Sequence, residues 1–243
     1  MSDDLEVRTV AAVERAFAIL EAFNQDDITL SLAELAERTG LYKSTILRLI
    51  QTLERVGYIG RTAGGDYHIG PRPLRLGRLY QRAVSKEDVI MPALQRLVEV
   101  TTESAGFHVR FNDRRLCLYR VDSQQPLRDH FKPGDELPLG RGAAGVVLSA
   151  FTEPDDARFA DVRQDMVAVS RGTLWPDMGG VAAPVFNADG KLEGALTVSG
   201  PATRFDDAAV AQFKPILLSS ARDVTAALGG DISMFERALG KPR

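Results

Sequence analysis

The sequence is poor in the residue types that enzymes and cross-linked proteins use most. It holds a single cysteine and three histidines, His68, His108 and His130. One cysteine excludes a disulfide within the chain and a cysteine-based zinc site. The histidines follow no metal-ligand spacing, and no G-x-S-x-G nucleophile motif occurs. We therefore expect no metal, no cofactor and no catalytic residue.

Long apolar runs are missing as well. Nowhere do 18 apolar residues follow one another, and the first ten residues, MSDDLEVRTV, are acidic and polar rather than basic and then apolar. We expect a cytoplasmic protein with no membrane partner. The 243 residues suffice for one short domain and one of middling size.

Acidic residues are scarce in the stretch LYKSTILRLIQTLER, residues 41–55. Four apolar residues recur at helical spacing and predict a buried helix face. They are Ile46, Leu49, Ile50 and Leu53. The opposite face carries only cationic, hydroxyl and amide groups before Glu54, and such groups suit phosphates and base edges. Its members are Lys43, Ser44, Thr45, Arg48, Gln51, Thr52 and Arg55.

A shorter helix is expected just before this one. Ser31 and Glu34 form the S-x-x-E pattern of a capping box, and Gly40 stands where a left-handed residue ends a helix. Two short helices joined at a glycine indicate a helix-turn-helix whose second helix reads DNA. The alternative is an ordinary helical hairpin inside an enzyme.

A β-hairpin is predicted behind the reading helix, because two short alternating runs flank the pair Gly64-Gly65. Such a wing can lay Arg61, Gly65 and Tyr67 along the DNA backbone. Charge favours this interpretation, since nine Arg or Lys stand against two acids between positions 38 and 82. That is a local charge of +7 in a chain of net charge −3.

Helices flank this predicted DNA-binding region on both sides. The run VAAVERAFAILEAF, residues 10–23, has a broad apolar face that is wide enough to cover the helix pair and also to meet another subunit. The run RPLRLGRLYQRAV, from residue 72, predicts a basic linker helix. We expect three parts, a winged helix-turn-helix in 1–70, a linker helix in 71–84 and a second domain in 85–243.

The second domain mixes strands and helices. Period-two alternation predicts strands at 107–111 and 116–121, and a hairpin with strands at 181–186 and 192–199. A long helix is expected at 205–228. The small-residue run Gly140 to Gly145 precedes a helix at 146–151; it indicates either an anion site at a helix start or tight helix packing on a sheet. The fold class is α+β, with a mainly antiparallel sheet.

Taken together, these stretches resemble the IclR-type transcriptional regulators over nearly the full chain. The matching stretches are VERAFAILEAF, LAELAERTGLYKSTILRLIQTLERVGYI, YHIGPRPLRLG, PLGRGAAGVVLSA and VAAPVFNADGKLEGALTVSGPATRF. The resemblance implies a ligand-responsive regulator that binds double-stranded operator DNA and, through a GAF-like C-terminal domain, a small organic effector, a carboxylate or aromatic acid. It also implies a homodimer or a dimer of dimers. The alternatives are a ligand-transforming enzyme and a non-DNA adaptor on the same fold.

The resemblance assigns the start of the recognition helix to Lys43, Ser44, Thr45 and Arg48. The further candidates for DNA are Ser31 and Tyr42 beside the two helices, and Arg61, Gly65 and Tyr67 on the predicted wing. For the effector, the family's pocket positions fall on Ala143, Ala144, Met178, Gly180, Thr197 and Ser199. Thr197 and Ser199 share a strand parity, so their hydroxyls are expected on one face. Further candidates from neighbouring segments are His108, Arg110, Tyr119, Arg120 and Trp175.

Overall fold

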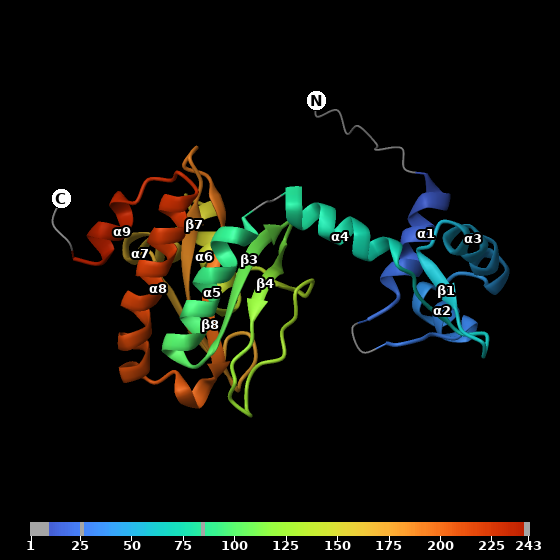
Figure 1. Cartoon of the computed structure of the whole chain (residues 1–243), viewed down its shortest axis with the longest axis horizontal. Coiled ribbons are helices and arrows are strands. Elements are labelled where there is room, and N and C mark those ends of the chain that lie inside the picture. The colour runs from blue at the N-terminus through green and yellow to red at the C-terminus, as the bar shows by residue number, and fades with distance from the viewer. Residues whose placement is uncertain (1–9, 25–26, 84–85, 241–243) are drawn as a thin grey trace. The chain divides into compact units, whose positions relative to one another are not determined.

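A computed structural model describes residues 10–24, 27–83 and 86–240. The chain divides into two compact units, Met1–Ala83 and Val84–Arg243 (Figure 1). The boundary at 84–85 that the sequence predicts between linker helix and second domain lies outside the described residues. Within those residues, no helix has both the length and the apolar character needed to span a bilayer.

Three helices build the core of the first unit. They are α1 (Ala11–Glu21), α2 (Leu32–Thr39) and α3 (Lys43–Arg55). The predicted capping box is confirmed, since the Glu34 N–H donates to the Ser31 hydroxyl and the Glu34 carboxylate accepts from the Ser31 N–H. Gly40 has φ +68° and ends α2, as expected, so α2 and α3 form a helix-turn-helix.

A two-stranded wing and a further helix complete this unit. The wing pairs β1 (Ile59–Arg61) with β2 (Tyr67–Ile69), which confirms the predicted hairpin. α4 (Arg72–Ala83) follows. The shared core consists of Ile19, Leu30, Leu35, Ile46, Ile50, Leu53, Ile59 and Tyr67. The Leu30–Tyr67 bridge and the buried side chains of Ile59 and Tyr67 hold the hairpin to this core.

The second unit is built on one antiparallel sheet, in the order β5-β4-β3-β8-β7-β6. Its strands are β3 (Ser104–Phe111), β4 (Arg114–Val121), β5 (Glu136–Pro138), β6 (Ala168–Arg171), β7 (Met178–Phe186) and β8 (Leu192–Pro201). The two predicted strand pairs are confirmed. The two short strands at the sheet's edges, β5 and β6, are not recognisable in the sequence.

Helices cover both faces of this sheet (Figure 1). On one face lie α5 (Glu87–Thr101) and α8 (Asp207–Ala227), over a large apolar core that includes Phe107, Leu196 and Val198. On the other face lies α6 (Gly142–Thr152), over small residues such as Ala182 and Ala195. The short α7 (Ala160–Asp165) and α9 (Ser233–Ala238) complete the unit.

One boundary differs from the sequence prediction in a way that matters for function. The helix expected at 146–151 begins four residues earlier, at Gly142, so Gly142 to Gly145 form its first turn rather than a loop before it. Gly142 itself has φ +66°, a backbone angle that residues other than glycine rarely adopt. The start of α6 therefore lies directly on the sheet.

Candidate functional sites

The outer face of α3 is available to a partner. Lys43, Ser44 and Arg48 are exposed, and Tyr42 just before the helix is 84% exposed. None of these side chains forms an ion pair within the described part of the chain. Leu47, which the sequence reading omitted from this face, is 40% exposed and offers an apolar contact of the kind that thymine methyl groups make.

Two of the residues predicted for DNA have other tasks. The ring of Tyr67 is 2% exposed and packs in the core, so it does not lie along the outer surface as the alternation suggested. The Ser31 hydroxyl donates its one hydrogen to the Glu34 carboxylate at 2.7 Å and has none left for a phosphate. At the wing, exposed Arg61 lies over the Tyr67 ring at 5.5 Å and its Nε donates to the carbonyl oxygen of Gly65.

A small cavity lies in the second unit between the sheet and the start of α6. Its free space is about 30 Å³, room for one or two water molecules. The structure brings seven of the predicted effector residues to its wall, His108, Ala143, Ala144, Met178, Gly180, Thr197 and Ser199. They come from β3, α6, β7 and β8. Residues missed by the sequence reading also line it, chiefly Arg115, Phe131, Ser170 and Leu174.

Arg115 gives this cavity its chemical character. Its side chain is buried, 4% of the residue being exposed, and its Nε has no hydrogen-bond partner in the part of the chain that the structure describes. Burial lowers the pKa of Arg115 to about 10, yet the guanidinium stays charged at neutral pH. No carboxylate among the described residues forms an ion pair with it. A buried charge without a counter-ion is costly, so this arginine suits an anion that enters from outside.

His108 adds a second donor or acceptor to the same wall. It is 2% exposed, and none of the described residues forms a hydrogen bond with its Nδ1. Burial holds the pKa of His108 well below its usual value, and the charges of Arg115 and Arg120 lower it further. The ring is therefore neutral at physiological pH.

The first turn of α6 faces this pair of side chains. A Cβ at Gly142 would come within 3.2 Å of the Arg115 Nη2, so the guanidinium lies against the helix start. The Gly142 N–H donates to the Thr173 hydroxyl at 3.1 Å, while the next N–H groups of the turn have no partner within the helix. A guanidinium and a helix N-terminus that converge on one point favour a carboxylate.

Four other predicted residues do not line the cavity. Arg110 projects outward and pairs with Glu153 at 3.0 Å. Tyr119 packs against Phe107 in the core on the opposite face, because a bulge at Leu118 reverses the parity of β4. Trp175 is 48% exposed and does not line the cavity, whereas its chain neighbour Leu174 and the Phe131 ring stacked on it do. Arg120 is buried and committed to Asp129 and Asp122.

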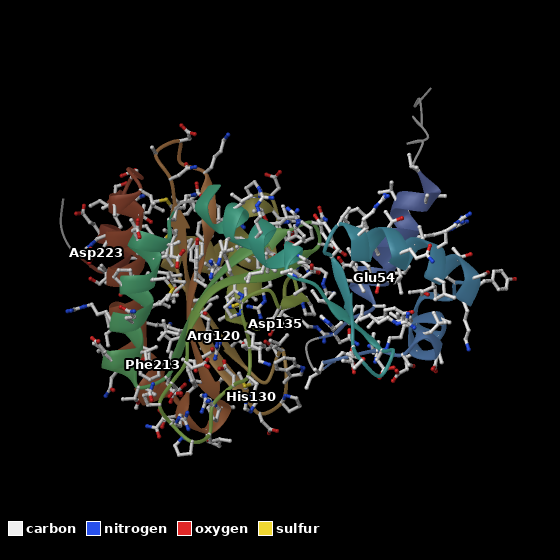
Figure 2. All side chains as sticks on the ribbon, turned by 45° about the vertical axis from the view of Figure 1, so that its right-hand side comes forward. Glu54, Arg120, His130, Asp135, Phe213 and Asp223 are labelled. Atoms are coloured by element: carbon white, nitrogen blue, oxygen red, sulfur yellow. The ribbon has the colours of Figure 1, made fainter. Side chains whose placement is uncertain are left out.

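A loop between β4 and β5, residues 122–135, contributes Phe131 to the cavity wall; we call it the roof loop. Figure 2 labels Arg120 on β4 together with His130 and Asp135 of this loop. Phe131 of the loop lines the cavity and stacks on Trp175, with ring centroids 5.1 Å apart. Asp129 of the loop pairs with Arg120 and accepts a hydrogen bond from Ser199.

Comparison with known proteins gives matches to both units. Residues 12–63 match the model of the IclR helix-turn-helix domain, and residues 156–226 match that of the bacterial transcriptional regulator IclR C-terminal domain. The HTH-type transcriptional regulator BhcR of Paracoccus denitrificans is 28% identical over 94% of this chain and 91% of its own length. The transcriptional repressor IclR of Escherichia coli is 23% identical over 91% of each chain.

Solved structures share the fold. An IclR transcriptional regulator from Alicyclobacillus acidocaldarius superposes with a TM-score of 0.77 over 92% of this chain and 100% of its own, at 24% identity. An IclR homologue from Microbacterium hydrocarbonoxydans, solved in complex with 4-hydroxybenzoate, gives 0.77 over 90% and 99% at 20% identity. The curated relatives named above are transcriptional regulators and not enzymes.

Proposed function

This chain belongs to the IclR family of bacterial transcriptional regulators, and we propose that it reads operator DNA with α3 and responds to a small carboxylic acid bound beneath the roof loop. The exposed Lys43 and Arg48 supply charge for phosphates or a guanine edge, and Ser44 and Thr45 supply hydroxyls. Tyr42 and Arg61 extend this surface. Operator binding implies action in the cytoplasm.

The single observation that carries the ligand proposal is buried Arg115 without a counter-ion beside the start of α6. A carboxylate there gains two charge-assisted hydrogen bonds and the field of the helix. The relative solved with 4-hydroxybenzoate binds an acid of this kind. Because the free space is only about 30 Å³, any organic acid must move part of the wall to enter.

We propose that the regulator acts as a dimer. The first unit exposes apolar side chains on two helices, Val13 and Phe17 on α1 and Leu74, Leu76 and Leu79 on α4. Such residues favour burial against a second copy. A two-fold dimer would place two reading helices at successive major grooves of a near-palindromic operator. The effector can act only by preferring one DNA-affinity state, typically by ~1–3 kcal/mol.

The test uses the full chain in filter binding against genomic DNA fragments with competitor DNA. We expect binding that weakens steeply with salt, because it rests on phosphate contacts. Butyrate and its uncharged analogue butyramide are then compared by calorimetry. We expect heat from butyrate alone, and none in an Arg115→Met variant. Fragments bound without preference would contradict the operator assignment, and equal binding of acid and amide would contradict the carboxylate assignment.

A further inference from the structure

The Asp129 carboxylate of the roof loop lies beside the cavity, bound by two side chains that reach it from β4 and β8. Its two oxygens are held by the guanidinium of Arg120 and by the hydroxyl of Ser199 at 2.5 Å. Ser199 is part of the cavity wall, on which Arg115 also lies. Arg120 and Asp129 are both almost fully buried, with side chains 3% and 1% exposed. Arg120 and Ser199 thus form a built carboxylate subsite next to the cavity.

The roof loop does not need Asp129 to be anchored at its two ends. At the start, the Ser123 hydroxyl donates to the Thr102 carbonyl and the Ser123 N–H donates to the Ser104 hydroxyl. Arg204 donates to the carbonyl of Leu127, two residues before Asp129. Near the end, the Gly134 N–H donates to the Cys117 carbonyl at 2.8 Å. Asp129 and Phe131 lie between these anchors; Phe131 lines the cavity, and Asp129 contacts Ser199 of the cavity wall. The centre can therefore lift while both ends stay attached.

We propose that Asp129 is a placeholder and that the effector is a dicarboxylate. One ligand carboxylate binds Arg115 and the start of α6, and the other replaces Asp129 at Arg120 and Ser199. This inference rests on the proposed function, since it names the class of acid that the same pocket selects. The exchange keeps Arg120 paired, because one carboxylate leaves as another arrives. A monocarboxylate satisfies Arg115 alone and leaves Asp129 in place.

The displacement of Asp129 has a structural consequence that can be observed. Phe131 lies two residues farther along the roof loop, with the Arg120 guanidinium over its ring at 5.6 Å and Trp175 stacked on it. Release of Asp129 therefore carries Phe131 away from Trp175 and enlarges the cavity. Trp175 is the chain's one tryptophan, so its fluorescence reports on the roof loop without any label.

The experiment titrates the full chain with acids matched in carbon number, butyrate against succinate and pentanoate against glutarate, and follows Trp175 fluorescence and binding heat. We expect one of the dicarboxylates to bind about 10- to 100-fold more tightly than its monocarboxylate partner, since it gains a second buried charge-assisted contact. Only the dicarboxylate should change the Trp175 emission.

Matched variants isolate the placeholder. Asp129→Asn removes its charge with little change of shape, so we expect the preferred dicarboxylate to bind several-fold more tightly. Asp122→Asn is the control, because Asp122 also pairs with Arg120 but is half exposed, whereas the Ser199 hydroxyl donates to Asp129. We expect no change in the dicarboxylate preference there. If Asp129→Asn fails to fold, the acid comparison on the unaltered chain still decides.

The outcomes separate this inference from the proposed function. Mono- and dicarboxylates that bind equally, both through Arg115, would overturn the placeholder and leave the carboxylate pocket standing. Tight dicarboxylate binding with unchanged Trp175 emission would also overturn the displacement of the roof loop. Binding of neither acid, or binding that survives Arg115→Met, would overturn both.

Discussion

Both units of the molecule present arginine side chains that pair with no carboxylate of the described residues, but the two settings differ. On α3, Arg48 is exposed to water, where an unpaired guanidinium is fully hydrated. Beneath the roof loop, Arg115 is buried and its Nε lacks any partner. An unpaired cation in water says little by itself, whereas one in the interior costs stability and must be explained by function.

The largest expected effect contrasts two arginines of β4. Arg120→Met leaves the buried Asp129 carboxylate without its cationic partner, so we expect a loss of about 3–5 kcal/mol in the free energy of unfolding. Arg115→Met leaves no carboxylate of the described residues unpaired, so we expect the free energy of unfolding to stay unchanged or to rise by about 1–3 kcal/mol. Urea unfolding of both variants measures this. A large loss in Arg115→Met would mean that Arg115 stabilises the fold.

The second largest effect is expected at the exposed Arg48 of α3. Arg48→Ala should weaken operator binding by about 1–3 kcal/mol, because a base or phosphate contact is lost. It should leave unfolding and acid binding unchanged, since Arg48 is exposed. Arg96→Ala, an exposed arginine of α5, is the control and should bind DNA normally. Equal loss of DNA and acid binding by Arg48→Ala would point to misfolding instead.

Much of the first unit could be predicted because its rules are local. Ser31, Glu34 and Gly40 specify a cap and a stop within ten residues, and the Gly64-Gly65 pair specifies a hairpin. Tyr67 was wrongly placed because its environment is not local. Its backbone pairs with Leu30, far away in sequence, and its ring fills the space between wing and helices.

The pocket could be predicted only in part. Family positions on α6, β7 and β8 converge as expected, but Arg115 has no local sign that separates it from Arg110. The two arginines are cross-strand partners on the same face of the sheet. Arg110 reaches Glu153 at the far end of α6, whereas Arg115 lies at the helix start. The fold of α6 and the roof loop, not strand periodicity, decides which one is buried.

A smaller effect is expected from pH, through His108. Burial depresses its pKa in the folded chain, while in the unfolded chain it is near 6.5. Below that value the unfolded chain takes up a proton that the folded chain does not bind. The stability contribution is therefore complete above pH 6.5 and is lost on acidification, by at most ~1.4 kcal/mol per pH unit. The free energy of unfolding of His108→Gln, measured beside that of the parent chain from pH 7.5 to 5.5, should fall less steeply with acidification. Parallel curves would contradict a buried neutral histidine.

The smallest effect tests whether Ser31 acts in folding or in DNA binding. Ser31→Ala removes the cap of α2 and should cost about 1 kcal/mol of stability. Ser31→Asp keeps a good cap, so we expect stability close to that of the parent, while it adds a negative charge. If Ser31 serves only as the cap, both variants keep the operator affinity, apart from a slight loss for Asp through long-range repulsion that high salt removes. If Ser31 touches a phosphate, the Asp variant loses affinity far more than the Ala variant, and salt does not restore it. The two variants thus separate the two roles. Loss of the cap lowers the stability of the Ala variant, whereas loss of a phosphate contact lowers the DNA affinity of the Asp variant.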